Sequence, residues 1–202
     1  MRWYLVAGAA ALVAGCVAVN EDIGKAGDVG ADAVMLVGKI EIDPPIKPEE
    51  QKYQAGWDVF NTKRHFIGRA VLFTSDKPEY RERTGTALNP PLEQTFFVKL
   101  PKSQRYVVKG SVTMALVSRG ASARSGFDQT ELLFPTPFEF DVRPADKAIY
   151  VGTLRLHRDE FHEVTKAELV DQYPEASAEF RKRFPGEPLP RKALIRRPKP
   201  KG

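Results

Sequence analysis

Cysteine is almost absent from this chain of 202 residues, because Cys16 is the only one. A single thiol excludes an internal disulfide framework and leaves no set of cysteine ligands for a structural zinc site. The sequence also lacks the HExxH, G-x-S-x-G, P-loop and G-x-G-x-x-G motifs. These absences argue against metalloproteases, serine hydrolases and nucleotide-binding enzymes. The sequence therefore predicts no catalytic residues, no metal site and no cofactor.

The chain lacks net positive charge outside its two ends, although its formal net charge is +5. From Arg181 onward, nine Lys or Arg residues accompany one acid, Glu187, which makes +8. Arg2 adds +1, so residues 16–180 carry −4. A domain that binds nucleic acid needs a basic face. The mildly acidic middle of the chain therefore predicts no nucleic-acid partner.

The first 16 residues, MRWYLVAGAAALVAGC, hold one positive charge at Arg2 and then an unbroken apolar run. A basic start, an apolar segment of about 7–15 residues and small residues at a cleavage site are typical of a bacterial export signal. The last four residues of this run, Val13, Ala14, Gly15 and Cys16, resemble the lipobox of bacterial lipoproteins. This resemblance implies attachment of diacylglycerol to Cys16, cleavage before it and acylation of the new amino terminus.

The resemblance also implies a location. Several acyl chains such as palmitate on one residue anchor a protein firmly, whereas a single chain holds it only marginally. We therefore expect residues 1–15 to be a signal peptide and the lipid bilayer to be a partner through acylated Cys16. Val17 rather than aspartate follows the cysteine, which in enterobacterium-like sorting favours the outer membrane, facing the periplasm.

Two other interpretations of the N-terminus stay open. The apolar stretch from Trp3 to Val19 could persist as an uncleaved membrane helix, although it is at the short limit of about 17–25 residues for such a span. Alternatively, Cys16 is an incidental small residue within an ordinary signal peptide.

Strand-like runs recur from residue 33 onward, separated by segments rich in turn-forming residues. The runs are residues 33–42, 65–76, 93–101, 105–118, 127–143 and 147–158. In the fourth run one parity holds Tyr106, Val108, Val112, Met114 and Leu116, and in the last run one parity holds Tyr150, Leu154 and Leu156. This alternation predicts that each set lies on one buried face. The spacing, with no helix between the runs, predicts an antiparallel β-sandwich of about six or seven strands.

One helix is expected after the strands, in the segment DQYPEASAEFRKRFPG at residues 171–186. Tyr173, Ala176, Phe180 and Phe184 are spaced to form one apolar stripe. Asp171 is placed to cap the start of this helix, and Pro185-Gly186 ends it.

These patterns divide the chain into four parts. We expect a lipoprotein signal peptide at 1–15, a lipidated flexible tether at 16–32, a mainly β domain with its C-terminal helix at 33–186, and a disordered, Pro-rich basic tail at 187–202.

The basic tail is the one candidate binding segment with a clear mechanism, since clustered cations attract polyanionic surfaces at short range. The candidate anion-binding residues are Arg191, Lys192, Arg196, Arg197, Lys199 and Lys201. Anionic lipid, lipopolysaccharide, peptidoglycan or an acidic protein would be suitable partners. The alternative is a solvated tail without a partner.

A cluster of possible metal ligands lies near residue 160, namely His157, Asp159, Glu160, His162 and Glu163. A spacing of five residues puts the two histidines on opposite faces of a strand and well apart on a helix. We therefore interpret the cluster as a solvated strand end.

The sequence favours a membrane-anchored, non-enzymatic envelope protein, acting as a binding or accessory component in the assembly of the envelope or of a surface structure. Two alternatives stay open. One is a hydrolase directed at carbohydrate or peptidoglycan, which would need two carboxylates converging about 5–10 Å apart in a cleft. The other is a structural subunit of a larger envelope complex.

Overall fold

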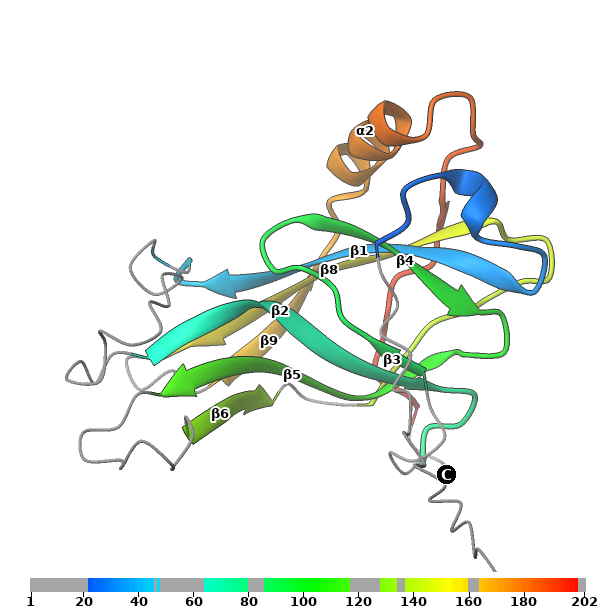
Figure 1. Cartoon of the computed structure of the whole chain (residues 1–202). Helices are drawn as coiled ribbons and strands as arrows, with labels where there is room; N and C mark the ends of the chain where they lie inside the picture. The colour runs from blue at the N-terminus through cyan, green and yellow to red at the C-terminus, as the bar shows by residue number, and fades with distance from the viewer. Residues whose placement is uncertain are drawn as a thin grey trace, which may run out of the picture.

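The computed structural model describes residues 22–45, 47, 64–79, 86–116, 128–133, 137–159 and 164–199 (Figure 1), with the backbone alone for 64–69, 113–116 and 128–133. The described residues are mainly β, with ten strands in two five-stranded sheets, one α-helix and one short 3-10 helix, η1 (Ala26–Asp28). Each of the six strand-like runs of the sequence contains a strand of the structure.

The first sheet, which we call the helix-side sheet, is built around β8. It consists of β1 (Ala33–Asp43), β4 (Thr95–Pro101), β8 (Ala148–Arg158), β9 (Val164–Val170) and β10 (Arg191–Lys192). Strand β8 pairs along one side with β1, which pairs in turn with β4. Along its other side β8 pairs with β10 at its start and with β9 over its second half.

The second sheet, which we call the far sheet, is antiparallel throughout its described pairs. It consists of β2 (Arg64–Ser75), β3 (Thr86–Leu88), β5 (Tyr106–Leu116), β6 (Asp128–Leu133) and β7 (Phe138–Glu139).

The inner faces of both sheets contribute to one hydrophobic core. Buried side chains of the helix-side sheet, such as Leu36, Leu100 and Leu156, belong to the same cluster as Leu72 and Val112 of the far sheet. Burial of apolar side chains contributes about 1.5–3 kcal/mol for each large one, so this shared core is the main source of stability.

The prediction of antiparallel pairing is wrong for two pairs, because β1 and β10 both run parallel to β8. Turn-rich sequence between consecutive strands predicts hairpins, whose strands are antiparallel. Strands β1 and β8 are separated by the entire far sheet and β4, so no local turn determines their relative direction. Parallel strands need such a long crossover connection.

The predicted helix is confirmed as α2 (Tyr173–Arg183), and its stripe packs as expected. Ala176, Phe180 and Phe184 are buried, and Tyr173 packs against the same cluster. The N-cap is Gln172 rather than the predicted Asp171, although Asp171 Oδ1 accepts a hydrogen bond of 3.2 Å from the backbone N–H of Tyr173. Figure 1 shows α2 on the side of the helix-side sheet that faces away from the far sheet.

The last strand-like run does not keep one parity on one face, because β8 contains a bulge that separates Tyr150 from Leu154 and Leu156. Opposite Val37 and Lys39 of β1 lie Tyr150 and Thr153, so β8 has one extra residue there. Gly152 has φ +101° at this point, which glycine adopts readily. Tyr150 therefore packs under α2, whereas Leu154 enters the core between the sheets.

A second irregularity has the same effect on β5. The pairing of β2 with β5 shifts between Phe73 and Thr74, which lie opposite Lys109 and Val107. Val107 and Val112 are both buried in the core despite their opposite parity, while Val108 is partly exposed.

The C-terminal segment corrects the expectation of a disordered tail, as far as it is described. Residues 187–199 return from α2 to the sheets, where Arg191 and Lys192 form β10, and Ala193 and Ile195 are buried in the core. The alternating apolar side chains of Ala193 and Ile195 hold this Pro-rich segment on the sheets, because their burial removes apolar surface from water.

Candidate functional site

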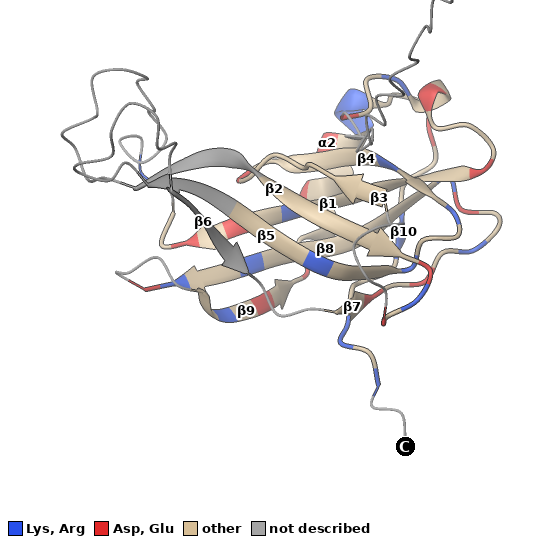
Figure 2. Cartoon of the chain, turned by 60° about the horizontal axis from the view of Figure 1, so that its bottom comes forward, with Lys and Arg blue, Asp and Glu red and all other residues tan. Residues whose placement is uncertain are grey.

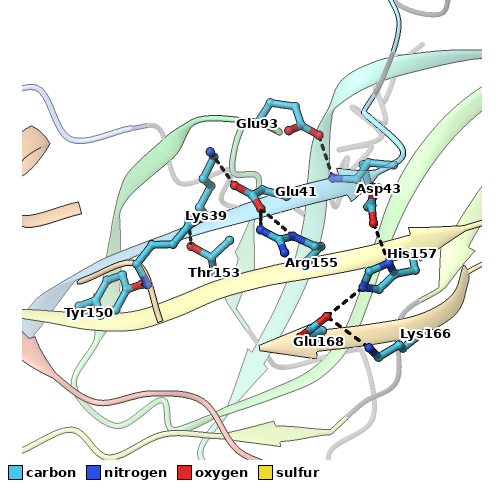
Figure 3. A network of polar contacts seen from close by, with 12 residues as sticks. Lys39, Glu41, Asp43, Glu93, Tyr150, Thr153, Arg155, His157, Lys166 and Glu168 are labelled. Atoms are coloured by element: carbon cyan, nitrogen blue, oxygen red, sulfur yellow. Dashed lines mark hydrogen bonds and ion pairs between the residues drawn. The ribbon is translucent and has the colours of Figure 1, made fainter. Parts of the chain in front are cut away.

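The outer face of the helix-side sheet is divided into an apolar half and a charged half. In the apolar half, the outward side chains of β1, β4 and β8 are Ala33, Met35, Val37, Phe97, Ala148 and Tyr150. In the charged half, the outward side chains of β1, β8 and β9 are Lys39, Glu41, Asp43, Thr153, Arg155, His157, Lys166 and Glu168 (Figure 3). The division falls at Gly38 and Gly152, where β1 and β8 pass the bulge.

Helix α2 covers the apolar half through aromatic contacts. The ring of Phe97 lies 6.2 Å from that of Phe180 and 5.3 Å from that of Phe184, the latter edge to face. Tyr150 and Tyr173 also meet edge to face, with centroids 5.4 Å apart. Such pairs add about 0.5–1.5 kcal/mol to the free energy gained from burial.

The chain before β1 is attached to this face, which corrects the expectation of a flexible tether for residues 22–32. The backbone N–H of Ile23 donates to the carbonyl of Phe97 at 2.6 Å, and the N–H of Phe97 donates to Asp22 Oδ1 at 3.0 Å. Ile23 and Val29 are buried in the apolar half. Glycines at 24, 27 and 30 suggested flexibility, but these two apolar side chains outweigh that signal.

Arg183 joins the same segment to the end of α2. Its guanidinium lies 2.8 Å from Asp22 Oδ2 and donates a hydrogen bond of 2.7 Å to the carbonyl of Ile23. It also lies 5.0 Å from the ring centroid of Phe97, a cation–π contact. Asp22 and the last turn of α2 therefore form one connected surface.

A groove of about 460 Å³ runs along one flank of α2, between the helix, η1 and the loop before β8. Buried Ala33, Met35, Ala148 and Phe180 line it together with exposed Lys147 and other residues of that loop and of η1. Alanine has a small side chain and glycine has none, which explains why the groove stays open along this flank of α2.

A polar pocket of about 200 Å³ lies on the opposite flank of α2. The hydroxyl of Tyr150 accepts a hydrogen bond of 2.8 Å from the backbone N–H of Gln172, and the hydroxyl of Thr153 donates to Gln172 Oε1 at 2.8 Å. Burial raises the pKa of the Tyr150 phenol, so it stays protonated at neutral pH. The carboxylates of Glu175 and Glu179 complete the lining.

Glu41 is at the centre of one ion network of the charged half (Figure 3). Its carboxylate is 2.8 Å from Lys39 Nζ and accepts two hydrogen bonds from Arg155, at 3.0 and 3.1 Å. Burial raises the pKa of Glu41, but the hydrogen bonds and charges of Lys39 and Arg155 outweigh it and lower this pKa below its ordinary value. The carboxylate is therefore ionised and fully engaged.

His157 is at the centre of the second network. Its Nδ1 lies 2.8 Å from Asp43 Oδ2 and its Nε2 lies 3.1 Å from Glu168 Oε2. The hydrogen bonds from His157 and Lys166 lower the pKa of Glu168. These carboxylates lie on opposite sides of the imidazole, so they join three strands rather than surround a common metal position. In the part of the chain that the structure describes, no group of three or more candidate metal ligands occurs.

Glu93 lies beside the charged half with φ +62°, in the turn before β4. Its Oε1 accepts a hydrogen bond of 2.8 Å from the backbone N–H of Ile42. Burial nevertheless raises the pKa of Glu93, which is the opposite of the shift at Glu41.

Three of the predicted anion-binding residues are paired with acids of the domain. Arg191 forms a bidentate contact with Asp146 at 2.6 and 2.8 Å, and this contact lowers the pKa of Asp146. Arg196 lies 2.8 Å from Glu139 of the far sheet, and Lys192 pairs with Asp171. The role of these residues in binding anions stays a prediction. Arg197 and Lys199 are exposed.

The remaining predicted site residues lie outside the described part of the chain. They are Val13, Ala14, Gly15, Cys16 and Lys201, together with Glu160, His162 and Glu163 of the acidic cluster. In the described residues no helix is both long and apolar enough to cross a membrane.

The sequence did not predict the groove and the polar pocket beside α2, nor the attachment of residues 22–32 to the sheet. The apolar stripe of α2 predicted that the helix packs on the sheet, whereas the glycines at 24, 27 and 30 gave no sign of the attachment, because a Cβ at Gly24 or Gly27 would meet nothing within 4 Å. Nothing local indicated which strands the helix covers. Comparison with family models, curated proteins and solved structures finds no match to this chain.

Proposed function

We propose that this chain is a lipid-anchored envelope protein, whose β-sandwich domain is a non-enzymatic binding or accessory component. Residues 1–15 would be removed as a signal peptide, and acylated Cys16 would hold the domain at the outer membrane, facing the periplasm. The observation that carries the proposal is the lipobox-like sequence at Val13–Cys16 followed, after only five residues, by a folded domain at Asp22.

The charged half of the outer face supports binding or structure over catalysis. The described carboxylates of Glu41, Asp43 and Glu168 are each held by a lysine, arginine or histidine of a neighbouring position. A general acid or base needs an accessible proton site in a cleft, close to the reacting group. These groups instead join β1, β8 and β9 to one another.

A mass measurement on the chain purified from membranes tests the anchor. We expect the mass of a chain that begins at Cys16 and carries acyl groups, and partition of the protein into a detergent phase. Cys16→Ser should abolish both the added mass and the partition. An unmodified chain of full length would instead support the uncleaved helix, and an unmodified shortened chain would support an ordinary signal peptide.

A hydrolase is the second candidate, supported by the polar pocket. Glu175 and Glu179 lie one helical turn apart and both line this pocket together with Tyr150 and Thr153. Two carboxylates beside a cavity are the minimum for glycoside hydrolysis. If the domain is a hydrolase, peptidoglycan digestion by the purified protein should be lost in Glu175→Gln and Glu179→Gln, while Lys77→Gln, outside the pocket, retains it.

A further inference from the structure

We propose that the last turn of α2, with the N-terminal segment beside it, is a docking surface for the anionic headgroups of the membrane that holds Cys16. This surface, which we call the basic end, consists of Lys25, Arg181, Lys182 and Arg183. The inference rests on the proposed lipid anchor, and it names the part of the domain that faces the bilayer.

The first argument is the length of chain between the anchor and the fold. Six residue steps separate Cys16 from Asp22, and a fully extended chain spans about 20 Å over that length. A domain of this size is about 40 Å across. Asp22 must therefore lie on the membrane-facing side of the domain when Cys16 is in the bilayer.

The second argument is what surrounds Asp22. Arg183 contacts Asp22 and Ile23 directly, and Arg181 and Lys182 are exposed in the same turn of the helix. Lys25 is exposed three residues after Asp22. Four basic residues therefore lie close to the point where the chain enters the domain. Of these, Arg183 is paired with Asp22, whereas Asp28 Oδ2 accepts a hydrogen bond of 3.1 Å from the backbone N–H of Lys25.

The third argument is charge complementarity. Basic side chains beside an anionic leaflet are attracted over about one Debye length, about 8–10 Å, and a linker of at most about 20 Å lets the basic end come within that distance. Cations at the end of a helix also complement its negative pole, so they add no electrostatic strain to α2.

The C-terminal segment fits this role less well than the sequence suggested. Arg191 and Lys192 are paired within the helix-side sheet, and Arg196 is bound to Glu139 of the far sheet. Figure 2 shows the described end of the chain leaving the domain on the side away from α2. With a short linker at Asp22, that side faces away from the bilayer.

Lysine footprinting on vesicles tests the basic end. Cys16 is the only thiol, so the chain from Cys16 to Gly202 can be coupled to a maleimide phospholipid in vesicles of phosphatidylcholine, with or without phosphatidylglycerol. This chain retains every described contact, because the described fold begins at Asp22. Acylation of each lysine by an amine reagent is then followed by mass spectrometry.

On anionic vesicles we expect Lys182 and Lys25 to react several times more slowly than on neutral vesicles. Lys77, which is exposed in the turn after β2, should react equally on both. High salt should remove the difference, because it screens exposed charges. Arg181→Glu should weaken the protection of Lys182 by about fivefold or more, since each basic side chain near such a surface contributes about that factor. Lys77→Glu is the matched control.

Equal protection of Lys77 and Lys182, or no dependence on phosphatidylglycerol, would overturn the inference. Protection of Lys199 in place of Lys182 would assign the docking surface to the C-terminal segment instead. The coupling is chemical, so this result does not depend on whether cells acylate Cys16. The mass measurement on the native protein decides that question separately.

Discussion

The two halves of the outer face of the helix-side sheet are built from the same strands and are stabilised in different ways. In the apolar half, aromatic and aliphatic side chains of β1, β4 and β8 are covered by α2 and by residues 22–30. In the charged half, the next residues of β1 and β8 form ion pairs that stay partly exposed. The comparison shows how one sheet face combines a rigid attachment surface with a solvated one.

The first test of this comparison truncates one side chain in each half. Phe180, on the buried face of α2 that covers the apolar half, is 1% exposed. Phe180→Ala should therefore lower the free energy of unfolding by about 3–5 kcal/mol through lost burial and a cavity. Arg155→Ala removes a partly exposed ion pair and should cost about 1 kcal/mol or less. Urea unfolding followed by circular dichroism measures both. Equal losses would show that the two halves contribute alike.

The second test acts on the boundary between the halves. A Cβ atom at Gly152 would lie 2.6 Å from Leu169 Cδ1, on a backbone with φ +101°. Gly152→Ala should therefore cost about 2–3 kcal/mol from left-handed strain and overpacking.

Gly27→Ala is the control for this boundary test, because a Cβ at Gly27 meets nothing within 4 Å. Its midpoint of urea unfolding should match that of the parent protein. If Gly152→Ala leaves the midpoint unchanged as well, the left-handed strain and overpacking assigned to position 152 are contradicted.

The third test separates the N-terminal segment from the apolar half. Arg183→Ala removes the ion pair with Asp22, the hydrogen bond to Ile23 and the cation–π contact with Phe97. We expect a loss of about 1 kcal/mol and faster hydrogen exchange at the Ile23 amide. Arg183→Lys keeps the positive charge but removes the planar guanidinium group with its several N–H donors, so it should have an intermediate effect. Unchanged exchange at Ile23 would contradict this attachment.

The fourth and smallest effect is a pH dependence within and beside the charged half. The pKa of Glu41 is lowered in the folded protein, so its contribution to stability is present above its unfolded pKa and is lost as the pH falls through its folded pKa. The pKa of Glu93 is raised, so stability falls as the pH rises through that raised value.

Two glutamine variants test the opposite contributions of Glu41 and Glu93 to the pH dependence of stability. Glu41→Gln should reduce the gain in unfolding free energy between acid and neutral pH, and Glu93→Gln should increase it, each by less than about 1 kcal/mol. Urea titrations at both pH values measure the gain. If the two variants changed this gain in the same direction, the opposite pKa shifts of Glu41 and Glu93 would be contradicted.

The candidate site was partly predictable because some of its signals are local. The helical stripe of Tyr173, Ala176, Phe180 and Phe184 depends only on spacing along one segment, and α2 follows it. The face of Tyr150 was not predictable from alternation, because one extra residue in β8 inverts the parity beyond it. The pairing of Arg191 with Asp146 joins positions 45 residues apart, which no local pattern indicates.

By itself the sequence determined the mainly β composition, the position of α2 and the uneven distribution of charge, because alternation, helical spacing and net charge are properties of short segments. Only the tertiary structure decided that β1 lies parallel to β8, that residues 22–32 and 187–199 pack onto the sheets, and that the basic end lies beside Asp22. These features depend on contacts between distant segments, whose free energy comes from burying apolar surface and pairing charges that are brought together only when the chain folds.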